Sequence, residues 1–374
     1  MSRSRSLTCL CSLLALLVLS GCAHRLRGPD HGAAQPPWVA DKASKEVAAL
    51  DVQHRVLLIG DAGYYLEDDP TLAALGRWAA AVESSSIVFL GDNIYNDGLT
   101  DEERERGEQI LGQQLGATPA HKIVIPGNHD WGMMPKNMNA KAIRNQQAFV
   151  DEWPDGRAEF IPKDGCMGPH TRVLLEAGAG RRAVVFIALD PTPWINERLR
   201  AACPTPETHE GVLARLDREL ARYSDDFVLV GSHYPMLTGG PHGGLSYGFL
   251  AELIIRPLGW MMGGLMNTYE PEYADWIART QEVFRRNPPE VYAAGHDHSL
   301  QLLDSGDVAG IYVVSGAGAR ERVSTVTHLP ESYFAHASEG FVVADFGTRD
   351  GRDAVVLRVV EAGSESPVFE MEIP

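Results

Sequence analysis

Residues 55–63 read RVLLIGDAG, a short apolar run that ends in a tight loop carrying the carboxylate of Asp61. Runs that are apolar at nearly every position and rich in branched residues are typical of strands buried on both faces of a sheet. Similar runs follow at residues 87–90, 122–125, 183–189, 227–230, 291–293 and 311–314. The sequence therefore predicts a folded body with buried sheets at its centre.

The segments between these runs carry helical patterns, at residues 72–82, 101–115, 140–152, 212–223 and 273–286. In residues 212–223, Leu213, Leu216 and Leu220 fall on one face of the predicted helix. The tail predicts a strand meander at residues 341–346, 354–360 and 368–373. Strands that alternate with helices indicate a layered α/β fold.

Five of the apolar runs lead into loops rich in metal-ligating residue types. The loops are Gly60-Asp61-Ala62-Gly63, Gly91-Asp92-Asn93-Ile94-Tyr95, Gly127-Asn128-His129-Asp130, Gly231-Ser232-His233-Tyr234 and Gly295-His296-Asp297-His298. Ligands of open α/β sheets bind at the carboxyl ends of the strands, so these loops can converge. Carboxylate, phenol, amide and imidazole groups are ligands for hard and borderline metal ions.

The candidate metal ligands are Asp61, Asp92, Tyr95, Asn128, His233, His296 and His298. Seven ligands are too many for one ion and suit two, which a central carboxylate can bridge. Taken alone, Asp61 could be a turn former and Tyr95 a half-buried core aromatic. His296 and His298 are more specific, because alternate residues of an extended chain face the same side. Asp130 and Asp297 are expected to support the ligands or to form turns rather than bind a metal ion.

This set of loops resembles the calcineurin-like metallophosphoesterases and, within them, the small, tartrate-resistant type of purple acid phosphatase. Many metallophosphoesterases have Asp-x-His in the first motif, whereas position 63 here is Gly and Tyr95 appears in the form Gly-Asp-x-x-Tyr. His242 follows His233 in a His-Tyr-Pro…His-Gly pattern that is similar to the same type. The resemblance covers residues 54–374. It implies a metallophosphoesterase-type layered sandwich, with two central β-sheets flanked by helices.

The resemblance also implies a role for each candidate residue. Asp61, Tyr95 and His298 would bind Fe(III), Asp92 would bridge, and Asn128, His233 and His296 would hold a divalent iron, zinc or manganese ion. A phenolate favours a hard trivalent ion, which fits Tyr95. His129 would donate a hydrogen bond to phosphate or to the leaving oxygen, and His242 would line the substrate pocket. The alternatives are a supporting role for His129 and a mobile surface loop around His242.

The function implied is a metal-dependent acid phosphatase, in which metal-bound hydroxide attacks a phosphomonoester. An alternative is a phosphodiesterase that acts on nucleotides or lipid headgroups. A different class, a non-catalytic envelope lipoprotein, would be expected to have lost ligands. The net charge of −17 makes nucleic acid an unlikely partner, because binding to its phosphates requires a basic surface. The partner that the resemblance implies is a small phosphate ester.

The N-terminal segment predicts export and lipid attachment. Arg3 and Arg5 precede an apolar run at residues 7–19 that has the length of a signal peptide. Leu19-Ser20-Gly21-Cys22 resembles a bacterial lipobox, which implies a signal peptide over residues 1–21 and a lipid on Cys22. The alternative is an ordinary secretory signal. Residues 22–53 are expected to be a flexible tether, and the protein is expected to be lipid-anchored in the cell envelope, at the outer membrane or facing the periplasm.

Residues 54–374 are expected to form a single catalytic domain with an apolar insertion near residues 245–270. The segment 245–266 is interrupted by Pro257, glycines and charges, so it is a poor membrane span. A core helix pair or a lid over the site is expected, and a surface element that touches lipid is the alternative. Cys166 and Cys203 could pair in an exported protein, or could be two unpaired buried thiols.

Overall fold

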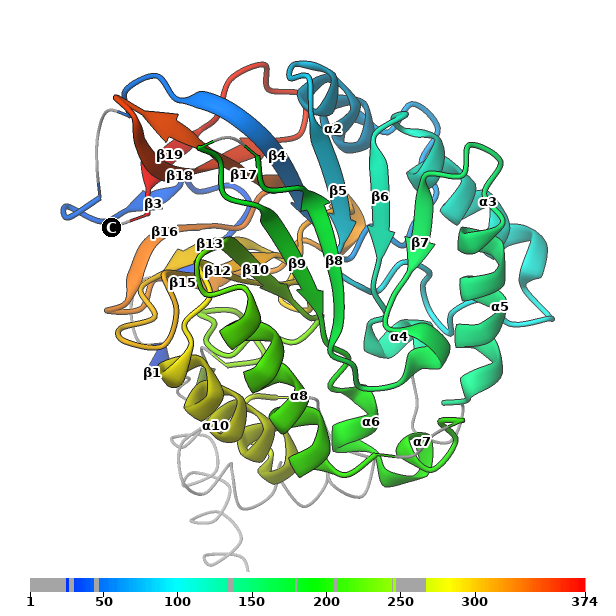
Figure 1. Ribbon diagram of the computed structural model, residues 1–374. Helices are drawn as coiled ribbons and strands as arrows, with labels where there is room; N and C mark the ends of the chain where they lie inside the picture. Colours follow the sequence, from blue (N-terminus) through cyan, green and yellow to red (C-terminus); the bar gives the residue numbers. More distant parts are fainter. Residues whose placement is uncertain are drawn as a thin grey trace, which may run out of the picture.

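The computed structural model describes residues 25–26, 30–43, 47–132, 138–178, 180–204, 207–243, 245–246 and 267–373 of the chain. The predicted signal peptide, Cys22 and residues 247–266 of the apolar segment lie outside this part. Within it, two large β-sheets lie face to face and helices cover their outer faces (Figure 1). This arrangement confirms the prediction of an α/β sandwich with two central sheets. None of the described helices is both long and apolar enough to span a membrane.

The first sheet has seven strands in the order β19-β18-β17-β4-β5-β6-β7. In chain order they are β4 (Asp51–Ile59), β5 (Ser85–Phe89), β6 (His121–Val124), β7 (Ala158–Phe160), β17 (Gly340–Arg349), β18 (Arg352–Glu361) and β19 (Phe369–Glu372). The strands from β4 to β7 are parallel, and the C-terminal meander pairs antiparallel with β4. The loops that follow β4, β5 and β6 therefore leave the sheet at the same edge.

The second sheet has eight strands in the order β3-β16-β13-β14-β12-β10-β9-β8. They are β3 (Trp38–Val39), β8 (His170–Leu175), β9 (Val184–Ala188), β10 (Phe227–Gly231), β12 (Val291–Ala294), β13 (Leu300–Leu303), β14 (Ile311–Ser315) and β16 (Ser332–His336). Its central strands β9, β10, β12 and β14 are parallel. Two short pairs lie apart from the sheets: β1 (Arg25–Leu26) with β11 (Leu245–Ser246), and β2 (Asp30–His31) with β15 (Val326–Thr327).

The core explains why the central strands read as continuous apolar runs. Successive side chains of a strand point to opposite faces of the sheet. In β4, Val56 and Leu58 pack between the two sheets, whereas Leu57 and Ile59 pack against the outer helices. Both faces are buried, so the strand has no polar face and shows no alternation of apolar with polar residues.

The helices begin where the sequence supplies capping residues. α2 (Pro70–Ala80), α3 (Arg104–Gly116) and α5 (Ala140–Asp151) cover the first sheet, and α8 (His209–Arg222) and α10 (Pro271–Arg286) cover the second. Asp69 accepts hydrogen bonds from the first N–H groups of α2, and Asn139 does the same for α5. The short helices are α4 (Asn128–Trp131), α6 (Thr192–Ile195), α7 (Glu197–Arg200), η1 (Lys163–Gly165) and η2 (Arg320–Arg322). All five predicted helices are confirmed.

Two parts of the structure differ from the pattern seen in the sequence. β8 lies at the edge of the second sheet and its side chains are mostly half-buried, so it has no continuous apolar run. The stretch predicted as a tether contains β2 and β3, and the ring of Trp38 stacks on that of His328 with 4.1 Å between centroids. This part of the chain therefore packs on the second sheet.

Cys166 and Cys203 form a disulfide, with their Cα atoms 5.7 Å apart. The bond connects the residue after η1 to the segment that follows α7. Of the two alternatives left open by the sequence, the structure thus has the pair rather than two free thiols. Their spacing along the chain could not decide this, because pairing depends on how the two segments meet in space.

Candidate metal centre

The five polar loops meet at one end of the molecule, where β4, β5, β6, β10 and β12 end. The N–H of Asp61 donates to the carbonyl of Gly91 (2.9 Å), which joins two loops of the first sheet. Nδ1 of His233, from the second sheet, donates to the carbonyl of Leu90 (2.8 Å). The N–H of His296 donates to Oδ2 of Asp61 (2.8 Å). The two sheets therefore contribute to a single site.

Three site residues follow their strands with a left-handed backbone. Their φ angles are 62° at Asp61, 53° at Asp92 and 69° at His296. This region is sparsely populated by residues other than glycine, although Asp and His enter it more readily than branched residues. Strain of this kind is concentrated at functional sites, where the surrounding structure holds a side chain in one direction. Here it accompanies three of the seven predicted ligands.

The first group of predicted ligands surrounds the carboxylate of Asp61. The phenol of Tyr95 donates to Oδ1 of Asp61 (2.8 Å), and Nε2 of His298 lies 3.4 Å from the same oxygen and 3.5 Å from the phenol oxygen. Tyr95 is fully buried. Burial, and then the negative charges of Asp61 and Asp92, raise the pKa of Tyr95 well above its ordinary value. The phenol thus carries a proton here, which a cation of high charge would displace.

The second group surrounds Nε2 of His233. Because Nδ1 of that ring donates to a carbonyl, Nε2 is the atom that faces the other ligands. It lies 3.1 Å from Oδ1 of Asn128, 3.2 Å from Nδ1 of His296 and 3.4 Å from Oδ1 of Asp92. Burial lowers the pKa of His233, but the carboxylates of Asp92 and Asp61 reverse this and raise the pKa to about 10. Burial raises the pKa of Asp92, but His233 and His129 hold it well below its ordinary value.

The donor set is suited to a metal ion. One oxygen each from Asp61 and Asp92 and one nitrogen of His233 lie within 4.8 Å of one another, and all three residues are buried. Buried carboxylates need a positive partner, which a cation bound by these donors would supply. The structure thus brings all seven predicted ligands into one connected cluster, and their binding of metal ions stays a prediction.

Asp130 holds two of the ligand loops together. Its fully buried carboxylate accepts hydrogen bonds from the backbone N–H groups of Gly127 (2.8 Å), Asn93 (3.0 Å) and Ile94 (3.2 Å). The side-chain amide of Asn93 donates to it as well (3.0 Å). Asp130 therefore fixes the loop of Asp92 against the turn that carries Asn128, which agrees with the supporting role expected for it.

His129 lies beside the second group without joining it. Its Nδ1 donates to the carbonyl of Asn96 (2.8 Å), and its Nε2 is 3.9 Å from Oδ2 of Asp92. Nη2 of Arg322 lies 3.3 Å from the same Nε2. The ring therefore faces the space next to Asp92, as the expected contact with phosphate requires.

His242 stacks against one of the predicted ligands. Its ring lies 4.0 Å from the ring of His296 between centroids. Its N–H donates to Oδ1 of Asp297 (3.1 Å), and its Nδ1 is 3.1 Å from Oδ1 of Asn267. Asp297, which the sequence suggested as a supporting residue, thus holds the loop of His242 beside the site.

Two neighbours of the site were not predicted from the sequence, Asn267 and Arg322. Asn267 lies at the end of the apolar segment, where nothing in the local pattern indicates a contact with His242. Arg322 lies four positions after the run Gly316-Ala317-Gly318. A Cβ at Gly316 would lie 2.8 Å from Oδ2 of Asp61, so this run packs tightly against the site. The only signal for Arg322 in the sequence was a basic residue close after this run in a strongly acidic chain.

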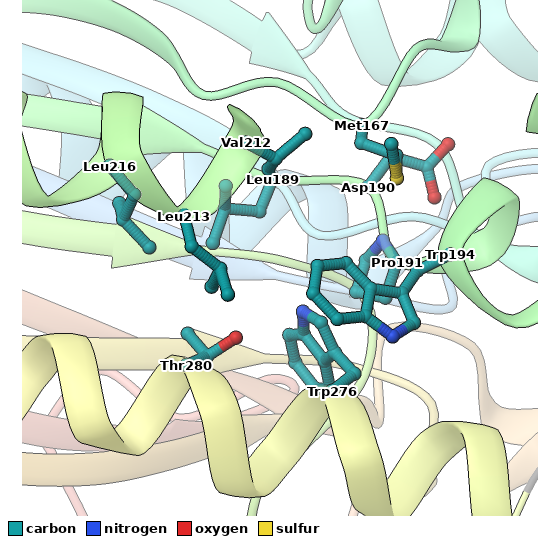
Figure 2. Close-up of a pocket in the computed structure, with 10 residues that line it drawn as sticks. All are labelled: Met167, Leu189, Asp190, Pro191, Trp194, Val212, Leu213, Leu216, Trp276 and Thr280. Carbon is teal, nitrogen blue, oxygen red and sulfur yellow. The ribbon is translucent and has the colours of Figure 1, made fainter. Parts of the chain in front are cut away.

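A small pocket near the site does not bind substrate (Figure 2). Figure 2 shows Asp190 at one end of a pocket lined mainly by apolar side chains, among them Trp194 and Trp276. Its volume of about 10 Å³ has room for about one water molecule and excludes a substrate. Asp190 accepts hydrogen bonds from Nε1 of Trp131 (2.9 Å) and the N–H of Thr192 (2.8 Å). The carboxyl therefore supports the turn of Asn128 from behind.

Comparisons with known proteins agree with this geometry. A family model described as calcineurin-like phosphoesterase matches residues 54–300. The chain is 25% identical over 318 residues to tartrate-resistant acid phosphatase type 5 of Homo sapiens, covering 80% of this chain and 82% of that protein. It is 22% identical over 323 residues to purple acid phosphatase 17 of Arabidopsis thaliana, covering 82% and 81%.

Two solved structures share the fold. One is GAP50, the anchor in the inner membrane complex of Plasmodium, with a TM-score of 0.55, 16% identity and coverage of 86% of this chain and 89% of that one. The other is a purple acid phosphatase from seeds of yellow lupin (Lupinus luteus), with a TM-score of 0.53 and 12% identity. This match covers 85% of this chain and 53% of the lupin chain. The five polar loops converge on one site, and the family model matches residues 54–300. The chain therefore belongs to the calcineurin-like phosphoesterase family.

Proposed function

We propose that this protein is a metal-dependent acid phosphatase of the purple type, which hydrolyses phosphomonoesters at a dinuclear centre. The observation that carries the proposal is the position of Tyr95. Its phenol lies 2.8 Å from Asp61, in the same buried cluster as Asp92 and His233. The distant relatives named tartrate-resistant and purple acid phosphatases support it further.

In this proposal the ligands divide into the two groups seen in the structure. Asp61, Tyr95 and His298 would hold Fe(III), Asp92 would bridge, and Asn128, His233 and His296 would hold a divalent iron, zinc or manganese ion. The bound cations would activate water as a nucleophile and stabilise the charge on the phosphoryl oxygens. The left-handed backbone at Asp61 and Asp92 and the hydrogen bonds of Asp130 fix the directions of these side chains. Groups that are fixed in advance need no reorganisation during the reaction.

Two histidines of the chain act on the substrate. His129 faces the space beside Asp92, so it is placed to contact a phosphoryl oxygen or the leaving oxygen. His242 stacks on His296 and is held by Asp297, so it is placed to line the substrate space beside the second group. General acid–base groups need such positions within reach of the reacting oxygens.

The test is the visible spectrum of the iron-loaded protein. A tyrosinate bound to Fe(III) gives a charge-transfer band, so the purified protein should be coloured, and Tyr95→Phe should lose the band. Tyr234→Phe is a matched control, because Tyr234 is also buried, its ring contacts His233 and His296, and its hydroxyl accepts a hydrogen bond from Thr192 (3.3 Å). A colourless protein that contains stoichiometric iron, with no change of colour in Tyr95→Phe, would refute the proposal. Faster turnover of diesters than of monoesters would favour the phosphodiesterase alternative.

We also propose that Cys22 carries the lipid that anchors the protein in the cell envelope. The support is the lipobox-like sequence at residues 19–22. β1 follows Cys22 closely and pairs with β11, which follows the loop of His242, so the anchor would enter beside the site. Cys22→Ala should move the protein from the membrane fraction to the soluble fraction. An unchanged distribution between the two fractions would contradict the anchor.

A further inference from the structure

Arg322 ends η2, in a loop that runs along the candidate metal centre. Gly316, at the start of this loop, lies against Asp61, since a Cβ there would be 2.8 Å from the carboxylate. At the other end, the N–H of Ser324 donates to the carbonyl of His298 (2.9 Å). The loop is thus tied at both ends to residues of the first ligand group, and Arg322 lies between these attachments.

The guanidinium of Arg322 lies directly beside two site residues. Its central carbon is 4.2 Å from the centre of the Tyr95 ring, and Nη2 is 3.3 Å from Nε2 of His129. Arginine is always charged and stacks well on aromatic rings. In the described part of the chain, no carboxylate forms a direct ion pair with this guanidinium. Among these residues, the fixed positive charge is therefore balanced only from a distance, by carboxylates of the site such as Asp92.

Among the described residues, the same loop holds two buried polar atoms without a hydrogen-bond partner. They are Nε of Arg322 and Oγ of Ser324. Buried polar atoms without partners are uncommon in native structures, and each requires an explanation such as an absent ligand. The unpaired Nε belongs to the guanidinium that lies beside Tyr95 and His129.

Arg322 adds a second donor beside His129. Nδ1 of His129 donates to the carbonyl of Asn96, so the opposite nitrogen, Nε2, is the one that faces Asp92. Arginine has donors only, and Nη2 of Arg322 lies 3.3 Å from this Nε2. A cationic donor that keeps its charge therefore lies beside the histidine, next to the space at Asp92.

We propose that Arg322 binds substrate, by donating to a non-bridging phosphoryl oxygen, and that it selects dianionic phosphomonoesters over monoanionic diesters. A monoester carries a charge of about −1.5 to −2 near pH 7, against −1 for a diester, so the guanidinium attracts it more strongly. A guanidinium can bind two oxygens at once, and a monoester offers one more unsubstituted oxygen than a diester. Tyr95 and His129 orient the group. This inference deepens the proposed function and depends on it for the identity of the substrate.

The experiment compares Arg322→Ala and Arg322→Lys with Arg320→Ala in the iron-loaded protein. Arg320→Ala is the matched control, because Arg320 lies on the same turn and is exposed, and its replacement removes the same charge. Binding of inorganic phosphate is measured by calorimetry. We expect its dissociation constant to rise at least tenfold in Arg322→Ala, by a smaller factor in Arg322→Lys, and less than twofold in Arg320→Ala.

The kinetic part uses p-nitrophenyl phosphate as the monoester and bis(p-nitrophenyl) phosphate as the diester. In Arg322→Ala, we expect KM for the monoester to rise about tenfold and KM for the diester less than threefold. Metal content is measured for each variant, and the Lys variant decides the question if Arg322→Ala does not fold. Arg322→Lys should then show weaker phosphate binding than the wild type.

Three outcomes would overturn the inference. Unchanged phosphate affinity with a lower kcat would show that Arg322 only positions His129. Equal losses for monoester and diester would contradict selection by charge, and a loss in Arg320→Ala as large as in Arg322→Ala would show a general effect of surface charge. Wild-type protein that binds phosphate through Arg322 without hydrolysing any ester would refute the proposed function and leave the binding role intact.

Discussion

Replacing Asp130 should lower both the stability of the protein and its affinity for metal ions, mainly because buried hydrogen bonds are lost. The buried carboxylate accepts from the N–H groups of Gly127, Asn93 and Ile94 and from the amide of Asn93. In Asp130→Ala three backbone donors lose their acceptor in a buried place. Each such orphan costs about 1–3 kcal/mol, so the total is about 3–6 kcal/mol if neighbouring losses are partly shared. This is a large fraction of a stability of about 5–15 kcal/mol.

The milder variant Asp130→Asn keeps one oxygen as an acceptor and places an N–H₂ group where the other oxygen was. We expect a loss of about 2–3 kcal/mol, because about half of the donors lose their acceptor. Asp41→Asn is the control, since Asp41 is exposed and its replacement removes a carboxylate that is not buried. The assay is urea unfolding of metal-free protein, followed by metal titration, in which both Asp130 variants should bind metal at least tenfold more weakly.

The result that would refute this reasoning is specific. The free energies of unfolding of Asp130→Asn and Asp41→Asn could agree to within about 0.5 kcal/mol. The hydrogen bonds of Asp130 would then make no net contribution to stability, because hydrogen bonds to water would replace them. If stability fell but metal affinity were unchanged, the loop of Asp92 would not depend on Asp130 for its position.

Two further predictions concern the sheet and the ligand loops. Burial lowers the pKa of His54 from 6.5 to about 4, so the unfolded chain binds a proton between these values and the folded chain does not. The free energy of unfolding should fall by about 3 kcal/mol as pH drops from about 6.5 to about 4. Measured by urea unfolding, it should depend less on pH in His54→Gln. The same dependence on pH in the variant and the wild type would contradict the shift. Gly127→Ala places a Cβ 2.3 Å from Oδ1 of Asp92, so elemental analysis should find metal lost, whereas Gly156→Ala, with nothing within 4 Å, should retain it.

The loops of the candidate centre could be predicted because strand ends are recorded locally in the sequence. Apolar runs such as residues 55–59 are buried on both faces, and the loops that follow them carry the polar groups. β8 could not be predicted, because an edge strand with half-buried side chains lacks such a run. The disulfide between Cys166 and Cys203 could not be predicted either, since no local pattern records which segments meet.

The sequence by itself determined the layered α/β fold and the set of candidate ligands, because periodicity and residue type act over a few neighbouring positions. Only the tertiary structure decided which atoms face one another. Nε2 of His233 faces Asp92 because Nδ1 is held by the carbonyl of Leu90 from the other sheet. Arg322 lies on Tyr95 because a loop far along the chain crosses the site. Such contacts depend on the packing of the two sheets, which no short segment encodes.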